Sequence, residues 1–314
     1  MKIGVLGCSS IARRMILPAI RESKYFTLSA VASRSPEKAA SYAQLFDTQS
    51  YTYDELLKSD VDAIYVSVPV GLHYQWGREV LEHNKHLLME KTFTQTHAQA
   101  KELFELSSNR GLACMEALMY EYHPVQKQIK TCIGQLGEIK YVEAHFGFPH
   151  FANRDDIRYS KSLGGGASLD CLIYPLSFIF RTLGSTYSDY KSSIYYHKEF
   201  EIDERGYIHL EYPKSTAVIS YGFGHSYRNE ILVWGEKGIV KTHRAFTRPH
   251  KCEIPIQMWE NNKYSEIEPA QSNHFVDMLA AFSHNIKTLN NKSADTLERI
   301  WFIEKVLNSI GDKL

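Results

Sequence analysis

The first twelve residues constrain this chain more than any other segment does. They read MKIGVLGCSSIA, a short apolar run and a glycine turn, and a helical pattern with Ile11, Ile16 and Ile20 follows directly. A strand that enters a helix through a glycine turn leaves free backbone N–H groups at the helix N-terminus, where they can bind a pyrophosphate. The segment therefore predicts the opening βα unit of a dinucleotide-binding α/β domain.

The spacing of this turn is close to the G-x-G-x-x-G/A pattern of such domains. It reads Gly7-x-Ser9-x-x-Ala12, so serine stands where the second glycine usually lets the backbone approach the phosphates. A turn in any α/β domain can show a similar pattern, so the prediction depends on the rest of the chain. The cofactor contacts expected from this segment are Gly7, Ser9, Ser10 and Ile11.

Length and composition predict a globular protein with two domains. The chain has 314 residues, and a domain usually takes roughly 100–200. Apolar residues make up 44% and charged residues 23%, which is ordinary for a soluble protein with a full core. Lys and Arg number 36, as do Asp and Glu, so the charge balance favours neither a nucleic acid nor an anionic membrane as a partner.

The sequence indicates a cytoplasmic protein without a metal site. The N-terminus enters a strand rather than a signal peptide, and we expect no apolar run that approaches the length of a membrane-spanning helix. The 14 histidines contain no HExxH motif or similar ligand cluster. The absence of CxxC spacing favours free thiols in a reducing compartment for the five cysteines, which are Cys8, Cys114, Cys132, Cys171 and Cys252.

The first third of the chain alternates strands with helices. After the opening unit, the predicted strands cover residues 28–32, 63–68, 86–90 and 112–115. Predicted helices cover residues 38–44, 73–83 and a segment that begins after the capping pair Thr96-x-x-Gln99. Strands and helices that alternate at these lengths predict a doubly wound parallel sheet, here assigned to residues 1–120.

The remaining residues, 121–314, predict an α+β domain with a large, open, mostly antiparallel sheet. Its predicted strands cover 141–148, 207–212, 217–221, 230–234 and 239–242, without helices between them. Residues 207–212 alternate between apolar and polar, so one face is buried and the other meets water or a partner. Two amphipathic helices close the chain, with apolar faces made by Phe275, Met278, Leu279 and Phe282 and by Ile303, Val306, Leu307 and Ile310.

Three further segments make a family resemblance visible. They are EKT at 90–92, EALMYEYHP at 116–124, and DIR at 156–158 followed by GGGASLDCLIYP at 164–175. Together with the N-terminal turn, they resemble the Gfo/Idh/MocA family of NAD(P)-dependent oxidoreductases over essentially the whole chain. Within it, the chain looks most like the branch of sugar-nucleotide ketoreductases and dimeric dihydrodiol (xylose) dehydrogenases. The resemblance implies an N-terminal Rossmann domain and a second domain for substrate binding, whose open sheet often buries a dimer interface.

The resemblance also implies catalytic residues. The family's E-K-P motif falls on Glu90-Lys91-Thr92, with threonine in place of proline, and its lysine contacts substrate oxygen and helps to place the nicotinamide. The alternative is a solvated lysine at a strand end. The place of Lys91 at the carboxyl edge of the sheet, where ligands of such folds bind, favours the functional interpretation.

The segment around Asp170 and Tyr174 is similar to the family pattern D-x-G-x-[HY], with Leu172 in place of the glycine. On a helix the two side chains share a face. A ketone that gains hydride at carbon needs a proton at oxygen, and a phenol, whose pKa of ~10 falls beside an ammonium, can supply it. Asp170 would orient substrate hydroxyls or Lys91. The alternative is a helix-capping aspartate and a half-buried tyrosine. The motifs also place Tyr120, His123 and Arg158 on the substrate side.

The end of the second strand predicts the cofactor. An enzyme that uses NAD usually has Asp or Glu there, whose carboxylate accepts hydrogen bonds from the ribose hydroxyls. An enzyme that uses NADP needs positive charge there to bind the 2′-phosphate. Here Ser33 and Arg34 stand there without a carboxylate, so NADP is favoured and NAD is the alternative. Ser67, Pro69 and His73 resemble the family's T-P-x-x-x-H loop beneath the cofactor.

Three functions are consistent with these residues. The first is an NADP-dependent oxidoreductase that moves a hydride between nicotinamide and a carbonyl or secondary alcohol of a pyranose or nucleotide-linked keto sugar. The second is a dihydrodiol or aldose dehydrogenase of the same fold. The third is an NADP-binding regulator without activity, which the departures at Ser9, Thr92 and Leu172 allow. In each case the resemblance implies a homodimer or higher homo-oligomer.

Overall fold

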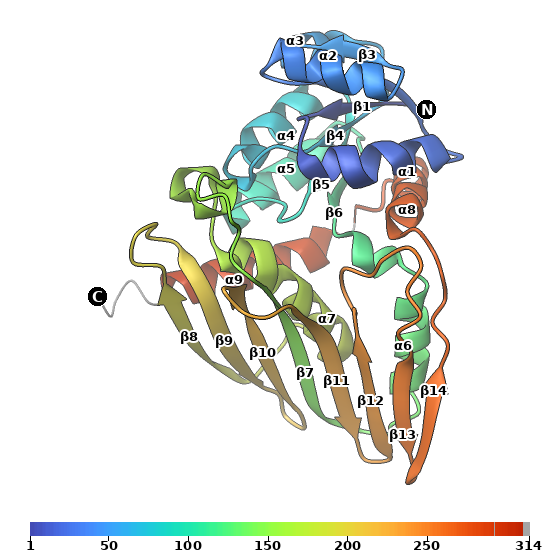
Figure 1. Ribbon diagram of the computed structural model, residues 1–314, viewed down its shortest axis with the longest axis vertical. Helices are drawn as coiled ribbons and strands as arrows, with labels where there is room; N and C mark the ends of the chain where they lie inside the picture. The colour runs from blue at the N-terminus through green and yellow to red at the C-terminus, as the bar shows by residue number, and fades with distance from the viewer. Residues whose placement is uncertain (292, 310–314) are drawn as a thin grey trace. The chain divides into compact units, whose positions relative to one another are not determined.

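The computed structural model describes residues 1–291 and 293–309, and its chain divides into two compact units. The first unit contains Met1–Tyr122 and Asn273–Ile300, and the second contains His123–Ser272 and residues 301–309. Each unit is built around its own sheet (Figure 1). Ile310, which was assigned to the last apolar helix face, lies outside the described residues.

The first unit contains a parallel sheet of six strands in the order β3-β2-β1-β4-β5-β6. Every residue of β4 is buried, as expected for a strand covered on both faces. The strand order reverses beside β1, and ligands of such sheets bind at the carboxyl ends next to this point. The strands are β1 (Lys2–Leu6), β2 (Thr27–Ala32), β3 (Gln49–Tyr51), β4 (Ala63–Val66), β5 (His86–Glu90) and β6 (Cys114–Ala117).

Helices cover both faces of this sheet. In Figure 1, α4 and α5 lie on one side, and α1 and α8 lie on the other. The chain from Gly7 enters a π-helical turn, Ala12–Ile16, before it continues as α1. The helices are α1 (Leu17–Glu22), α2 (Pro36–Leu45), α3 (Tyr53–Lys58), α4 (His73–Glu82), α5 (His97–Asn109), α8 (His274–Thr288) and the part of α9 (Ser293–Asn308) that ends at Ile300. The predicted α/β architecture is confirmed.

Helix α8 packs with the first unit, although the sequence analysis grouped it with residues 121–314. Its apolar face is buried there, and Phe282 stacks on Phe26 with ring centroids 5.7 Å apart. The chain therefore returns to the first unit after the second sheet is complete. A helical periodicity identifies the buried face of such a helix but not the sheet that it covers.

The second unit contains an eight-stranded sheet in the order β14-β13-β12-β11-β7-β10-β9-β8. Only the β7–β10 pair is parallel among its strand pairs, so the predicted mostly antiparallel sheet is confirmed. The strands are β7 (Ile139–Phe148), β8 (Asp189–Tyr196), β9 (Asp203–Glu211), β10 (Thr216–Phe223), β11 (Arg228–Gly235), β12 (Gly238–His243), β13 (Ile256–Glu260) and β14 (Lys263–Ile267).

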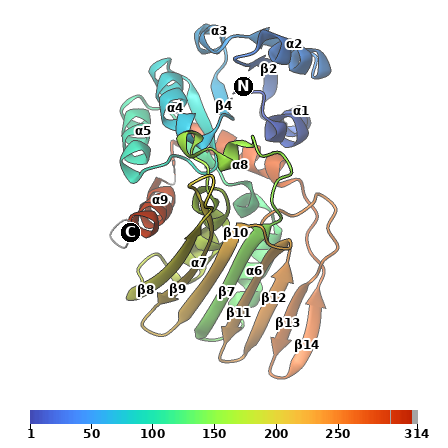
Figure 2. The same cartoon turned by 60° about the vertical axis from the view of Figure 1, so that its left-hand side comes forward.

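The two faces of this sheet differ. Helices α6 (Val125–Ile133) and α7 (Ile173–Leu183) lie behind it in Figure 2, which shows the other face turned toward the viewer. Side chains on β9 alternate between the two faces. Ile208 and Leu210 are buried under the helices, while Tyr207 on the other face is 44% exposed. The face with Tyr207 is called the open face below.

The helical segment Lys161–Leu183 is long and apolar enough to cross a membrane by composition alone, which the sequence analysis did not expect. Within its most apolar window, 78% is buried inside the protein. The segment therefore has the burial of a core helix, and it covers the sheet through α7.

Candidate active site

The glycine turn after β1 requires glycine. Gly7 has φ +106°, and a Cβ at this position would lie 2.3 Å from the carbonyl oxygen of Ser67. The serine that replaces the second glycine of the pattern makes two hydrogen bonds. The Ser9 hydroxyl bonds to the hydroxyl of Ser67, and it accepts from the Ala12 N–H at 3.1 Å. The helix begins at Ser10, and Ile11 in its first turn is 37% exposed. The loops after β1 and β4 are thus joined at the edge of the sheet.

The loop after β2 presents hydroxyl groups and positive charge. Ser33 is nearly buried, and its hydroxyl accepts from the Ser35 N–H at 3.2 Å, while Arg34 is exposed. Burial raises the pKa of the Cys8 thiol to about 11, and the nearby Lys38 ammonium opposes this shift. Lys38 therefore lies close to the Gly7 turn. Sequence analysis missed it, although its place in the first turn after the second strand was a signal.

His73 joins the loops after β4 and β5. It is fully buried at the start of α4, with Nε2 2.9 Å from the carbonyl oxygen of Val68 and Nδ1 2.9 Å from that of Thr92. Burial lowers the pKa of His73 to about 4, although the carbonyl contacts oppose this shift. The residue holds two loops together and has no exposed surface.

The loop after β5 carries Lys91. Its backbone N–H donates to Glu90 at 3.1 Å, and the hydroxyl of Tyr65 donates to the same carboxyl group. Burial raises the pKa of Glu90, while Tyr65 and Lys91 act in the opposite direction. The Lys91–Thr92 peptide bond is cis. The structure thus places Lys91 at the carboxyl edge that also holds the Gly7 turn, as predicted.

In the second unit, the triple-glycine segment packs against the Arg158 backbone. Gly166 N donates to the Arg158 carbonyl oxygen at 3.0 Å, and a Cβ on Gly165 would lie 2.4 Å from that oxygen. The helix that follows starts with a π-helical turn, Ser168–Leu172, which contains Asp170. The glycines thus let a loop and a helix start approach closely.

Arg158 is bound by carboxylates of its own unit. Its Nε donates to Asp170 at 2.7 Å and its Nη1 to Asp156 at 3.1 Å, and the guanidinium lies over the ring of Phe151 at 4.5 Å. These carboxylates, Asp170 first, raise the pKa of Arg158 despite its burial. Sequence analysis proposed separate roles for Arg158 and Asp170, and the structure brings them together as an ion pair.

Tyr174, Tyr120 and His123 are nearly buried. Tyr174 is 4% exposed in α7, and its ring centroid lies 4.7 Å from that of Phe146. Tyr120 lies in the 3-10 turn Met119–Tyr122 of the first unit. His123 starts the second unit and accepts from the Val125 N–H at 3.1 Å through Nδ1, and burial lowers its pKa to about 4.

Comparison with known proteins identifies the class. A model of the oxidoreductase family with an NAD-binding Rossmann fold (GFO/IDH/MocA) matches residues 1–118, and a model of the GFO/IDH/MocA C-terminal domain matches residues 128–241. The chain belongs to this family of oxidoreductases. The fold is therefore the one that the resemblance implied.

Two proteins, named as a 3-reductase and a 3-ketoreductase, are similar over nearly the full length, and a dihydrodiol dehydrogenase is similar over a shorter part. A dTDP-3,4-didehydro-2,6-dideoxy-alpha-D-glucose 3-reductase of Streptomyces antibioticus is 30% identical, over 98% of this chain and 96% of its own. The crystal structure of KijD10, a 3-ketoreductase from Actinomadura kijaniata in complex with NADP and TDP-benzene, has a TM-score of 0.92 and 29% identity, covering 98% of this chain and 97% of that chain. A trans-1,2-dihydrobenzene-1,2-diol dehydrogenase of Xenopus laevis is 31% identical, over 73% of this chain and 67% of its own.

Proposed function

We propose that this protein is an NADP-dependent reductase of the keto group of a nucleotide-linked sugar. The observation that carries the proposal is the carboxyl edge of the six-stranded sheet, where the Gly7 turn, the loop of Ser33 and Arg34, and Lys91 lie within one unit. Full-length similarity to proteins named as dTDP-sugar 3-reductases supports a nucleotide-linked keto sugar as substrate. In this proposal residues 1–120 bind NADP, and residues 121–314 bind the substrate and dimerise.

The residues at this edge fit a dinucleotide phosphate. Gly7 lets the turn pack closely against the Ser67 backbone, and the helix start at Ser10 and Ile11 supplies backbone N–H groups to the pyrophosphate. Ser33 and Arg34 bind the 2′-phosphate, and the Lys38 ammonium adds a second positive charge. Ser67, Pro69, His73 and Glu90 shape the remaining cofactor contacts. The edge thus favours NADP, with NAD as the weaker ligand.

NADPH held at this edge would supply the hydride that the carbonyl carbon takes up. Lys91 holds its ammonium at the carbonyl oxygen and stabilises the negative charge that develops there. Tyr174 donates the proton that this oxygen takes up. Asp170 orients the substrate, and its ion pair with Arg158 holds its carboxylate in position. Tyr120 and His123 contribute further contacts to the substrate. Arg158 acts on the substrate indirectly, because it holds Asp170 in position.

The test is turnover of NADPH with a panel of substrates. We expect NADPH absorbance to fall with a dTDP-linked 3-keto-2,6-dideoxy sugar generated in the assay, and NADH to be used less well. Reduction of NADP by D-xylose or by a trans-dihydrodiol, without activity on nucleotide sugars, would favour the dehydrogenase. Tight NADPH binding without turnover of any of these compounds would favour the regulator and contradict the proposal.

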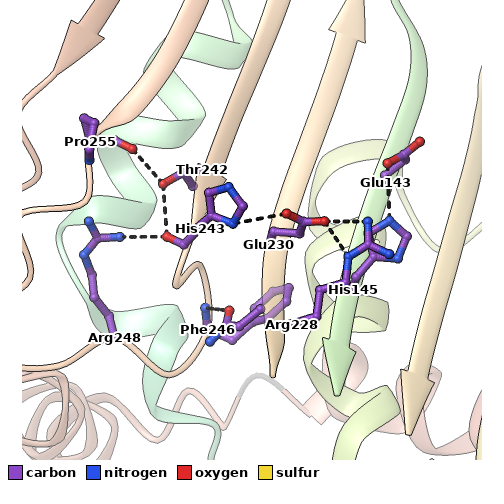
Figure 3. Close-up of polar contacts among 10 residues, drawn as sticks. Glu143, His145, Arg228, Glu230, Thr242, His243, Phe246, Arg248 and Pro255 are labelled. Atoms are coloured by element: carbon purple, nitrogen blue, oxygen red, sulfur yellow. Dashed lines mark hydrogen bonds and ion pairs between the residues drawn. The ribbon is translucent and has the colours of Figure 1, made fainter. Parts of the chain in front are cut away.

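We also propose that the open face of the eight-stranded sheet forms a homodimer contact in the cytoplasm. Its side chains form two rows across the strands. The polar row links Arg228 and His243 to Glu230 and pairs His145 with Glu143 (Figure 3). The aromatic row consists of Tyr141, Trp234, Trp259 and Tyr264, and Trp234 is 54% exposed.

Large exposed aromatic side chains on one sheet face are typical of a surface that meets another protein. Sedimentation at micromolar concentration is expected to show a dimer, and Trp234→Asp is expected to give the monomer. Trp301→Asp is the control, because Trp301 is similarly exposed but lies on α9. A monomer for the unaltered protein, or dissociation by both variants alike, would contradict the proposed interface.

A further inference from the structure

The loop that carries Lys91 is held by a buried carboxylate on the neighbouring strand. The backbone N–H of Phe93, two residues after Lys91, donates to Oε1 of Glu116 at 2.8 Å. Glu116 lies on β6, which pairs with β5 directly before this loop. The Phe93 ring is fully buried and stacks on Phe104 with centroids 4.7 Å apart. The loop is therefore fixed through its backbone and its apolar side chain.

The other oxygen of this carboxylate binds an arginine from the last helix. Nη2 of Arg299 donates to Oε2 of Glu116 at 2.7 Å, across a sequence separation of 183 residues. The two side chains are 4% and 2% exposed, respectively. Thr296, one turn earlier on α9, lies 3.4 Å from the same oxygen. The C-terminal helix thus reaches the loop of Lys91 through one charged group.

A buried carboxylate without a cation would be poorly stable in its charged form, because burial removes its hydration. It would turn toward water, and this movement would weaken its hydrogen bond to Phe93. Arg299 prevents this by supplying the opposite charge at hydrogen-bond distance, although burial by itself opposes that charge. Apolar side chains of similar volume would often stabilise a core equally well, so the ion pair suggests a requirement for position rather than for stability alone.

We propose that the Glu116–Arg299 ion pair is a positioning device that fixes the backbone from Lys91 to Phe93 and thereby the Lys91 ammonium. The inference rests on the proposed function, in which this ammonium acts on the carbonyl oxygen. Neither Glu116 nor Arg299 touches the reacting atoms, so both act through the loop. Displacement of a catalytic group by about 1 Å can lower the rate by roughly a hundredfold.

The test uses two measurements on the full-length protein. Amide hydrogen exchange at Phe93 reports the hydrogen bond directly, without any substrate, and kcat with a nucleotide-linked keto sugar reports the placement of Lys91. Arg299→Met is expected to speed exchange at Phe93 and to lower kcat by about tenfold or more. The control, Ile20→Ala, removes buried volume from α1 of the same unit. It is expected to lower the melting temperature without changing either measurement.

A rescue variant tests whether the hydrogen bond to Phe93 is enough to hold the loop when the buried charges are removed. In the triple variant Glu116→Gln, Glu121→Gln and Arg299→Met, the amide oxygen at position 116 can still accept from Phe93, and neither carboxylate that pairs with Arg299 remains charged. We expect this variant to recover slow exchange at Phe93 and much of the kcat that Arg299→Met loses. Recovery of slow exchange and of kcat supports the proposal. The rescue variant also keeps the test informative if Arg299→Met folds poorly.

Three outcomes would overturn the proposal: unchanged exchange at Phe93 in Arg299→Met, a loss of kcat in Ile20→Ala as large as in Arg299→Met, or faster exchange without any loss of kcat. If the unaltered protein turns over no keto sugar, the proposed function fails instead. Exchange at Phe93 would then still decide whether Arg299 and Glu116 hold the loop.

Discussion

The carboxyl edge of the parallel sheet and the open face of the second sheet hold their polar groups differently. At the edge, Ser67 and His73 are buried and bind backbone or neighbouring loop atoms, so their positions are set by the chain itself. On the open face, Arg228 and His243 are about half exposed and pair with Glu230 on the same surface (Figure 3). Groups that are fixed by the backbone suit a small ligand, whereas exposed pairs can rearrange against another protein surface.

The strongest test of this comparison is Lys91→Ala. In the proposed reaction this lysine stabilises the developing alkoxide, so we expect kcat to fall on the order of a hundredfold or more. Tyr174→Phe is expected to cost less, because water can deliver the proton in its place. Neither change should much alter NADPH affinity, which fluorescence titration measures, because neither residue is expected to reach the phosphates. Lys191→Ala on β8 is the control, and an equal loss there would remove the distinction between edge and sheet face.

The pH dependence of stability tests the buried edge itself. Burial lowers the pKa of His73 from 6.5 to about 4, so between these values the unfolded chain binds a proton that the folded chain does not. The free energy of unfolding therefore decreases as the pH falls through this window, by about 3 kcal/mol at most for this residue.

Urea unfolding at neutral pH and at about pH 4.5 measures this effect. His73→Gln is expected to give a smaller decrease than the unaltered protein. His123, whose pKa is also lowered to about 4, remains in both proteins, so the difference between them isolates His73. Equal decreases in the two proteins would show that His73 does not titrate as a buried group.

Substitutions in the loop after β2 are expected to have a smaller effect, on the preference between NADPH and NADH. In the proposed site, Ser33→Asp combined with Arg34→Ile would introduce a carboxylate that repels the 2′-phosphate and would remove the guanidinium proposed to bind it. We expect the preference for NADPH over NADH to fall by about tenfold or more, since one charged hydrogen bond is worth about that much. Lys58→Ile, on α3, should leave the preference unchanged. Equal affinity of the unaltered protein for both cofactors would contradict this assignment.

The sequence predicted the main strands of both sheets because their burial follows simple rules. The continuous apolar run at β4 and the alternation at β9 are both direct consequences of which faces are covered. Other elements have no such signal. The sequence analysis missed β3, β8, β13 and β14. Strands β3, β8 and β14 contain no buried residue, so none of these three carries a buried pattern. The hairpin that joins β13 to β14 was nevertheless marked by Asn261 and Asn262, which both adopt positive φ.

The sequence also indicates only part of the candidate active site. The motif residues could be named from the sequence because they follow strand ends or glycine turns. The ion pairs could not be predicted, since Arg158 meets Asp170 through an irregular loop and Arg299 meets Glu116 across 183 residues. Such contacts depend on tertiary packing, which local patterns do not specify. Lys91 was therefore predictable as a candidate, whereas the groups that hold its loop were not.

The smallest expected effect concerns the open face. Trp234 is 54% exposed, so Trp234→Ala leaves no cavity and should change the stability of the isolated monomer by no more than about 0.5 kcal/mol. Ile64→Ala, at a fully buried position of β4, should cost about 2–5 kcal/mol because it leaves a cavity in the core. Denaturant unfolding at a protein concentration where sedimentation shows monomers compares the two. A cost for Trp234→Ala close to that of Ile64→Ala would mean that the aromatic row belongs to the core of its own chain. The open face of the second sheet would then be packed like the covered faces of the parallel sheet.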